Sequence, residues 1–180
     1  SKVFLAAAKE RATELKVQER IRFVEADAGQ YNAGEGQFDI VSCIGATWIG
    51  NGLAGTIKLM LPALKPGGLL LIGEPYWTEP PPEEAYASAG LGKDDFTSLI
   101  GTLDRIETAG MKLVEMVLAN FHSWDRYAAA QWLTVDTWIK NNPNDPDVPE
   151  LSKWIAHAQR DYLQYGRRYL GWGVFVLQVK

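Results

Sequence analysis

The apolar positions along the chain follow two patterns, one typical of amphipathic helices and the other of buried strands. Residues 1–15 place most of their large apolar side chains on one face at helical spacing, which predicts a helix. Residues 38–45 and 69–73 are apolar almost without a break, as in strands that are covered on both faces of a parallel sheet. Three further apolar runs predict strands at residues 21–27, 111–118 and 173–179.

Helical stripes lie between these strands. One covers residues 53–64, where Pro62 is expected to bend or restart the helix because proline has no backbone N–H. Another follows Asp94 and Asp95, either of which can cap it, and Gly110 is well placed to end it. Strands that alternate with helices predict an α/β sheet with right-handed crossovers. Stretches rich in Pro or Gly predict a turn and a loop at residues 65–68 and 74–84.

A long polar and aromatic segment, residues 120–170, separates the last two strands. It is expected to form two helices, around residues 132–139 and 151–165, divided by a stretch of Asn and Pro. The chain is therefore divided into a core, residues 1–119 and 171–180, and a helical insertion between them.

Composition narrows the classes of function. A net charge of −4 argues against binding to nucleic acid or to an anionic membrane surface through basic residues. The single cysteine, Cys43, cannot form an internal disulfide, and no apolar run approaches the roughly 20 residues of a membrane helix. A cytoplasmic enzyme or binding domain is expected. One cysteine and two distant histidines provide neither a metal site nor a nucleophilic dyad.

Three short motifs follow one another along the first part of the chain: FVEADA at 23–28, FDIV at 38–41 and LKPGG at 64–68. In this order and spacing they resemble the class I S-adenosylmethionine-dependent methyltransferases, and more narrowly the small-molecule branch that includes enzymes of the ubiquinone and menaquinone pathways. The resemblance runs from residue 1 to about 118 and resumes at Trp172. It implies a Rossmann-like sheet with helices on both faces and an antiparallel last strand. It also implies transfer of a methyl group from S-adenosylmethionine to a small-molecule acceptor by in-line displacement.

The resemblance also implies parts that precede this sequence. The family's glycine-rich donor loop and its first two strands come before the helix that here begins at residue 1, so we expect an upstream segment or a separate chain to supply them. Without those strands, the strands at 21–27 and 38–45 would have unpaired edges. Lys16 stands where the family often has glycine, which predicts a non-glycine residue in the left-handed conformation.

The resemblance assigns the donor site to the carboxyl ends of strands, where open α/β sheets bind ligands. Asp27 is expected to accept a hydrogen bond from the adenine amino group, with the backbone N–H of Ala28 at the ring; a simple turn acid is the alternative. Cys43, Ile44 and Gly45 end the next strand, where the family places backbone beside the donor. The sulfur of Cys43 is interpreted as a small buried hydrophobe.

Candidates for the acceptor pocket follow the strand ends. Glu74 is the first candidate to orient the acceptor or accept its proton, and His122, just after the strand at 111–118, is the second. Trp48, Tyr76 and Trp77 are the candidate substrate contacts at the same edge, with ordinary packing or a structural hydrogen bond as the alternative for each.

The insertion offers a further wall for that pocket. Trp124 and Tyr127 lie closest in sequence to the end of the strand at 111–118, so we expect them to face the acceptor from a lid. Such a lid would enclose a cavity of roughly a few hundred cubic ångströms, suited to a small acceptor. The alternative is a helical subdomain whose aromatic side chains form only a small core of their own.

Two other classes of function stay open at this point. A nicotinamide-dependent Rossmann oxidoreductase would have a Tyr-x-x-x-Lys helix or a parallel final strand, and the sequence has no such helix pattern. A non-catalytic, methyltransferase-like binding subunit is the third hypothesis. The direction of the last strand separates the oxidoreductase from the other two.

Overall fold

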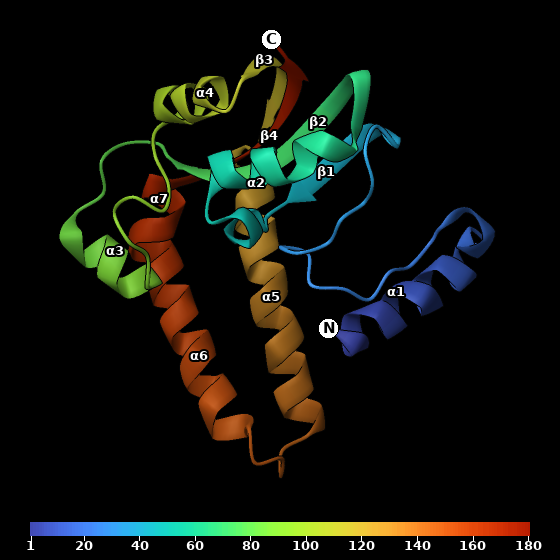
Figure 1. The fold of residues 1–180 in the computed structure, drawn as a ribbon. Helices are drawn as coiled ribbons and strands as arrows, with labels where there is room; N and C mark the ends of the chain where they lie inside the picture. Colours follow the sequence, from blue (N-terminus) through green and yellow to red (C-terminus); the bar gives the residue numbers. More distant parts are fainter. The chain divides into compact units, whose positions relative to one another are not determined.

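The computed structural model describes residues 1–180 as two compact units, residues 1–33 and 34–180 (Figure 1). The first unit contains helix α1 (Lys2–Glu14) and the short 3-10 helix η1 (Gln18–Arg20). Helix α1 ends as the sequence predicts, because Lys16 has a left-handed backbone with φ of 56°. The N–H of Lys16 bonds the carbonyl of Thr13 at 3.0 Å, and the N–H of Val17 bonds that of Ala12 at 2.9 Å, which is a Schellman motif without glycine.

The strand predicted at residues 21–27 is not formed. The backbone of Ile21 is extended, with φ of −122° and ψ of 125°, yet the segment belongs to no sheet and Ile21 and Val24 are exposed. A strand requires a neighbour that pairs with its N–H and C=O groups. Residues 1–33 contain no strand that could pair with it, so apolar sequence alone does not make this segment a strand.

The second unit is built on one four-stranded sheet with the order β1-β2-β4-β3. Its strands are β1 (Phe38–Ile44), β2 (Leu64–Trp77), β3 (Met111–Leu118) and β4 (Leu170–Val179). Strands β1 and β2 are parallel, whereas β4 is antiparallel to both of its neighbours, β2 and β3. The predicted antiparallel last strand is confirmed, and the oxidoreductase hypothesis, which a parallel last strand would have favoured, loses that support.

The LKPGG motif forms a bulge and not the predicted free turn. Phe38 of β1 pairs with Leu64, and Ile40 pairs with Leu69, so the β2 strand carries extra residues between these two pairs. Gly67 has φ of +77°, a conformation that suits glycine, and the ammonium group of Lys65 lies 2.9 Å from the carboxylate of Asp39. The motif therefore belongs to β2, because β1 provides hydrogen-bond partners on both sides of the bulge.

Helices α2 (Leu53–Met60) and α4 (Leu99–Thr108) supply the helical part of the core. The core cluster joins them to the sheet through fully buried side chains, among them Ile57, Leu70, Ile72, Ile106 and Leu177. A short 3-10 helix, η3 (Leu61–Ala63), follows α2 and contains Pro62, so the predicted restart at this proline is confirmed. The sheet and these helices form the mixed α/β fold that the sequence predicts.

The start of α4 differs from the prediction. Ser98 is its N-cap, with the hydroxyl accepting a hydrogen bond from the Gly101 N–H at 3.2 Å. Asp95 instead accepts from the N–H of Gly92, so this acid closes a preceding turn. Gly110 follows the end of the helix with φ of +84°, as predicted. The loop after β2 also contains a helix that the sequence pattern did not predict, α3 (Glu83–Ala89).

The insertion consists of a two-helix hairpin and a short return segment. Its elements are α5 (Phe121–Asn141), α6 (Val148–Asp161), the π-helical turn η4 (Tyr162–Gly166) and α7 (Arg167–Tyr169). Figure 1 shows α5 and α6 extending together away from the strands. Both predicted helices are present. Helix α5 is longer than expected, since Asn120 caps it by accepting from the Ser123 N–H at 2.9 Å, whereas α6 begins three residues earlier than predicted and gives way to η4 after Asp161. None of the helices combines the length and the apolar character that crossing a membrane requires.

Candidate active site

Two glycines at the carboxyl ends of β1 and β2 make room for an indole ring. Gly45 has φ of +69°, and its N–H donates to the carbonyl of Gly73 at 3.0 Å. A Cβ atom on Gly45 would lie 3.0 Å from Cη2 of Trp172, and one on Gly73 would lie 2.8 Å from Cζ2 of the same ring. Trp172 therefore lies directly against the backbone of both strands, a position that only glycine at these two sites allows.

Trp172 begins a stack of three aromatic rings that runs from β4 into the insertion. Its ring and that of Trp124 are nearly parallel, at 16°, with centroids 6.3 Å apart. Trp124 in turn stacks on Tyr127, with centroids 5.3 Å apart and planes 3° apart. We call Trp172, Trp124 and Tyr127 the aromatic stack. Trp172 was missed as a site residue; the signal that could have found it is the Gly-Trp-Gly sequence at 171–173 within an otherwise largely apolar strand.

A cavity of about 370 Å³ adjoins the aromatic stack. Its walls come from the ends of β2 and β3, from the start of α5 and from the start of β4. Tyr76 and Trp124 both line it, so the structure brings together two of the predicted acceptor contacts. A Cβ atom on Gly171 would lie 2.3 Å from Cζ of Tyr76, so the tyrosine ring occupies the space that a side chain would take. We call this space the aromatic cavity.

Hydrogen bonds attach the insertion to the edge of the cavity. The N–H of Thr78, just after β2, donates to the carbonyl of Tyr169 at 2.9 Å, and its hydroxyl donates to the carbonyl of Arg168 at 2.6 Å. Thr78 lines the aromatic cavity as well. The insertion therefore borders this cavity at its beginning, through Trp124, and is tied to the same strand end where it returns. Its action as a lid stays a prediction.

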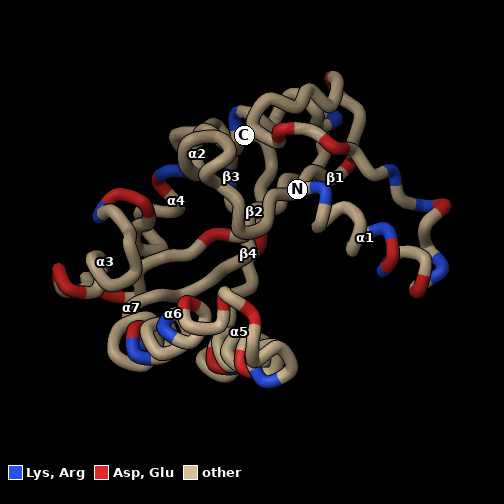
Figure 2. Tube along the Cα trace, turned by 90° about the horizontal axis from the view of Figure 1, so that it is seen from below, with Lys and Arg blue, Asp and Glu red and all other residues tan.

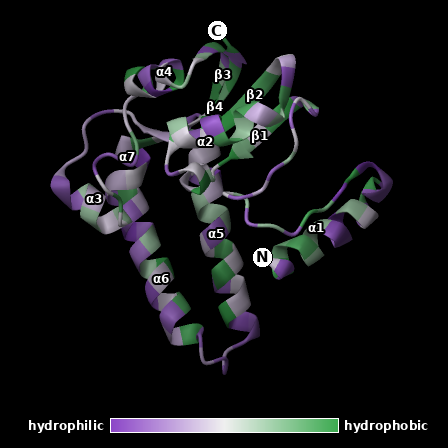
Figure 3. Cartoon of the chain, in the orientation of Figure 1, coloured by the Kyte–Doolittle hydropathy of each residue, from purple (hydrophilic) through white to green (hydrophobic).

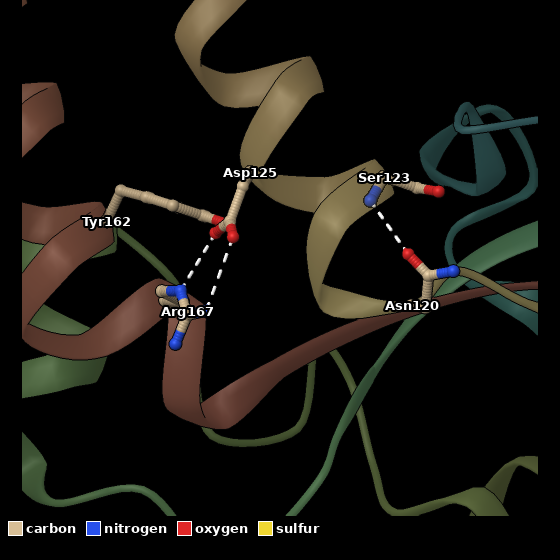
Figure 4. A network of polar contacts seen from close by, with 5 residues as sticks. All are labelled: Asn120, Ser123, Asp125, Tyr162 and Arg167. Carbon is tan, nitrogen blue, oxygen red and sulfur yellow. Dashed lines mark hydrogen bonds and ion pairs between the residues drawn. The ribbon is translucent and has the colours of Figure 1, made fainter.

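A polar network holds the first turns of α5 against the return segment (Figure 4). The carboxylate of Asp125 accepts from the hydroxyl of Tyr162 at 2.8 Å and from Nε and Nη2 of Arg167 at 2.8 and 3.3 Å. The Arg167 guanidinium holds the pKa of Asp125 below its usual range, whereas burial raises the pKa of Tyr162. Arg167 also lies over the ring of Phe121, 5.3 Å from its centroid. These contacts fix the part of α5 that carries Trp124.

Glu74 is buried away from the aromatic cavity, with 2% of its surface exposed. Burial raises its pKa to about 6, against the opposing effects of a hydrogen bond from Thr47 and the positive charge of Arg105. The Thr47 hydroxyl donates to Glu74 at 2.6 Å, and the carbonyl of Thr47 accepts from the hydroxyl of Thr56 at 2.6 Å. Glu74 thus links β2 to the segment that follows β1, and its role as a proton acceptor stays a prediction.

A second, more polar cavity of about 670 Å³ is lined by Thr47 and by residues that follow it in the chain. Trp48 lines it and is 74% exposed, so this candidate faces a different space from Tyr76 and Trp124. Arg105 also lines it, and donates to the backbone carbonyls of Asp94 and Asp95. The cavity therefore contains charged side chains of both signs.

The remaining candidates are not gathered at the aromatic cavity. Trp77 packs edge-to-face on Tyr86 and Phe96, as a local core would require. His122 is exposed on the first turn of α5. Tyr127 belongs to the aromatic stack but is 58% exposed and does not line the cavity. Cys43 is buried in the core, and burial raises the pKa of its thiol, in keeping with a small hydrophobe.

Asp27 and Ala28 belong to the first unit, residues 1–33. The carboxylate of Asp27 accepts a hydrogen bond from the N–H of Gly29 at 2.9 Å, which is the geometry of a turn acid. Their contact with a donor stays a prediction.

Known proteins resemble this chain in sequence and in structure. Residues 1–68 match a protein family described as a methyltransferase domain. YjhP of Escherichia coli K12, described as an uncharacterised protein, is 45% identical over 179 residues, which are 98% of this chain and 72% of YjhP. The X-ray structure of YjhP is similar to all of this chain, with a TM-score of 0.91 and 44% identity over 74% of that protein.

Two further crystal structures contain a ligand. A methyltransferase from Geobacter sulfurreducens, in complex with S-adenosyl-L-homocysteine, is similar to 100% of this chain and is itself covered to 73%, with a TM-score of 0.92 and 43% identity. One from Thiobacillus denitrificans, in complex with the same compound, has a TM-score of 0.90 and 39% identity with the same coverage, 100% and 73%. Both are described as S-adenosylmethionine-dependent.

Proposed function

We propose a reaction for this chain, which belongs to the class I S-adenosylmethionine-dependent methyltransferases and is an enzyme of that family. The proposed reaction moves the methyl group of S-adenosylmethionine to a small-molecule acceptor that binds in the aromatic cavity. The observation that carries the proposal is the position of this cavity. It lies at the carboxyl end of β2, and Trp172 in its wall also touches Gly45 at the end of β1. Open α/β sheets bind their ligands at such strand ends.

The residues at the end of β1 fit a donor molecule with a flat base and an apolar part. Gly45 has no side chain to block the strand end, and Ile44 beside it is 53% exposed. We propose that the backbone of residues 43–45 borders the donor, and that Asp27 and Ala28 contact its adenine. The donor supplies a methyl group on a positively charged sulfur, which is an excellent leaving group.

The chain itself is proposed to align the reactants and exclude water. In-line displacement at a sulfonium needs close approach in the correct direction more than it needs acid–base chemistry. Trp172 lies between the end of β1 and the aromatic cavity, so it can fix the distance between donor and acceptor. The insertion is proposed to act as the lid. Glu74 is proposed to act through Thr47, by holding the segment after β1 in place.

We propose that the enzyme acts in the cytoplasm on a free small molecule. Its single cysteine is buried and unpaired, which suits a reducing compartment. A cavity of about 370 Å³ is within the range of small-molecule pockets and would not accept a nucleic acid duplex. Its lining residues come from four separate elements, β2, β3, α5 and β4, and from the segments that join them.

The test is methyl transfer by the full-length protein with S-adenosylmethionine labelled at the methyl group and a panel of small acceptors. Trp172→Ala is expected to lower turnover by about 100-fold, a loss typical of misplaced reactants. Trp138→Ala, on the same helix as Trp124 but outside the cavity lining, is the control and should retain turnover. Failure to bind the labelled donor, or equal turnover by both variants and the unmodified protein, would contradict the proposal.

A further inference from the structure

A cavity that contains two arginines adjoins the aromatic cavity. It has a volume of about 510 Å³, and its charged side chains are Arg167, Arg168 and Glu79. We call it the arginine cavity. Thr78 and Phe121 line both this space and the aromatic cavity, so the two are continuous at these residues. A ligand in the aromatic cavity can therefore extend toward two guanidinium groups.

Both guanidinium groups keep N–H groups that a ligand can reach. Arg167 bonds Asp125 through Nε and Nη2, which leaves its Nη1 for another acceptor (Figure 4). Arg168 bonds Glu79 through Nε alone, which leaves both Nη1 and Nη2. The two side chains are 47% and 67% exposed, respectively. A guanidinium group with two such nitrogens matches the two oxygens of a carboxylate.

The carboxylates of the protein limit how much negative charge this cavity accepts. Asp125 pairs with Arg167 and Glu79 pairs with Arg168, so the four charges cancel. The Arg168–Glu79 pair is exposed, and an exposed ion pair adds little stability, so another anion can compete with Glu79. A ligand carboxylate carries the same single charge as Glu79 and can take its place. A doubly charged phosphate group would add repulsion from Asp125.

Apolar surface lies beside these charges. Phe121 and Leu163 line the arginine cavity and are 58% and 69% exposed, so a ligand can cover them. The lining of the aromatic cavity contains no charged side chain, and a carboxylate there would lose its hydration without gaining a counter-charge. The two cavities together therefore suit a molecule with an apolar body and one charged end.

We propose that the acceptor is an amphipathic monocarboxylate. Its carboxylate binds at Arg168, with Arg167 as the second cation of the site, and its apolar body lies along Phe121 into the aromatic cavity. This inference rests on the proposed function, because it names the acceptor class of the same site. It concerns binding, and the carboxylate is the group that anchors the acceptor.

The test measures binding of matched probes to the full-length protein by titration calorimetry at neutral pH and low salt. Octanoate, octan-1-ol and octylamine share one apolar chain and differ in charge, and acetate has the charge without the chain. Octanoate is expected to bind most tightly. Arg168→Gln removes the cation, so it should weaken octanoate roughly tenfold and leave octan-1-ol unchanged.

Two further variants separate a local effect from a general one. Arg160→Gln removes the same charge from an exposed position on α6 that lines neither cavity, so it should leave octanoate binding unchanged. Glu79→Gln removes the competing carboxylate and should tighten octanoate binding several-fold, whereas a purely structural ion pair predicts no gain. Circular dichroism establishes that each variant folds.

Three results would overturn the inference. The first is binding of octan-1-ol, octylamine or acetate that equals or exceeds that of octanoate. The second is an equal loss of octanoate affinity in Arg168→Gln and Arg160→Gln. The third is unchanged or weaker octanoate binding in Glu79→Gln, which also decides the matter if Arg168→Gln does not fold.

Donor turnover separates this inference from the function on which it rests. If the labelled methyl group is transferred to an acceptor of another class while octanoate fails to bind, the acceptor class is wrong and the methyltransferase function stands. If octanoate binds through Arg168 while no labelled donor is bound or turned over, the binding site stands and the proposed reaction is wrong.

Discussion

The sheet and the helical insertion are stabilised in different ways. The sheet side of the second unit has a continuous apolar core in which Ile57, Ile72 and Ile106 are fully buried. Helices α5 and α6 contain no buried residue at all. Figure 3 shows strands that are largely hydrophobic next to helices that alternate in character, and Figure 2 shows charges of both signs along α5 and α6.

This difference indicates that the insertion can open locally while the sheet stays folded. Regions with few buried apolar contacts open at lower free energy than the core does. The insertion depends instead on contacts at its base, chiefly the network around Asp125 and the hydrogen bonds of Thr78. The cavity therefore has one wall that the sheet core stabilises and one wall, from the start of α5, that depends on these polar contacts.

The largest expected effect comes from a truncation in the sheet core. Ile72→Ala removes a fully buried side chain and should lower the free energy of unfolding by about 2–5 kcal/mol. Leu133→Ala, on α5 with 67% of its surface exposed, should change it by less than about 0.5 kcal/mol. Urea unfolding of both variants measures the two values. Similar losses would show that the two regions are stabilised alike.

The second prediction concerns the buried carboxyl group of the core. Since the pKa of Glu74 is raised from 4.5 to about 6 in the folded state, its contribution to stability is complete below about pH 4.5 and decreases as the pH rises through 6. The decrease is about 2 kcal/mol, because one pKa unit corresponds to about 1.4 kcal/mol.

Glu74→Gln removes this titration and is the control. The difference in unfolding free energy between the natural protein and the variant should therefore change between about pH 4.5 and 7, to the disadvantage of the natural protein. Carboxyl groups with lowered pKa, such as Asp39 beside Lys65, contribute equally to both proteins and cancel. A difference that stays constant with pH would contradict the burial of a titrating Glu74.

The smallest expected effect is local to the insertion. Asp125→Asn weakens the hydrogen bonds from Tyr162 and Arg167, so amide hydrogen exchange should become faster at residues 121–127 and 162–169 while the strands keep their protection. Asp136→Asn, whose partner Lys140 lies on the exposed part of α5, should leave the base of the insertion unchanged. Faster exchange throughout the sheet would indicate that the two regions unfold together.

Local sequence patterns predicted the elements that depend on local chemistry. The strand at Phe38–Ile44 and the helix restart at Pro62 follow from side-chain spacing and backbone preference, whereas the left-handed Lys16 was implied by the family resemblance. The predicted strand at 21–27 failed because pairing depends on a neighbouring strand, which apolar pattern does not reveal. Ser98, and not Asp95, caps α4, because the carboxylate of Asp95 already accepts a hydrogen bond from the Gly92 N–H in the preceding turn.

The candidate site was predictable only in part, for a similar reason. Tyr76 and Trp124 were identified because they follow strand ends, and the structure brings both to one cavity. Trp48 satisfies the same rule yet faces another space, since the Thr47–Glu74 hydrogen bond sets the path of the chain after β1. Trp172 was missed because its position depends on two glycines, Gly45 and Gly73, that are distant in sequence.

The π-helical turn η4 gives the insertion a property that a regular helix would lack. A π-turn behaves as an α-helix with one inserted residue, and a shift of one residue rotates everything that follows by about 100°. Here the turn at Tyr162–Gly166 sets the directions of the two arginines after it: Arg167 meets Asp125 on α5, and Arg168 meets Glu79 beyond β2. The helical phase, and not the identity of the arginines alone, determines which partner each one reaches. In evolutionary terms, gain or loss of one residue in this turn would rotate the whole return segment and give both arginines new partners.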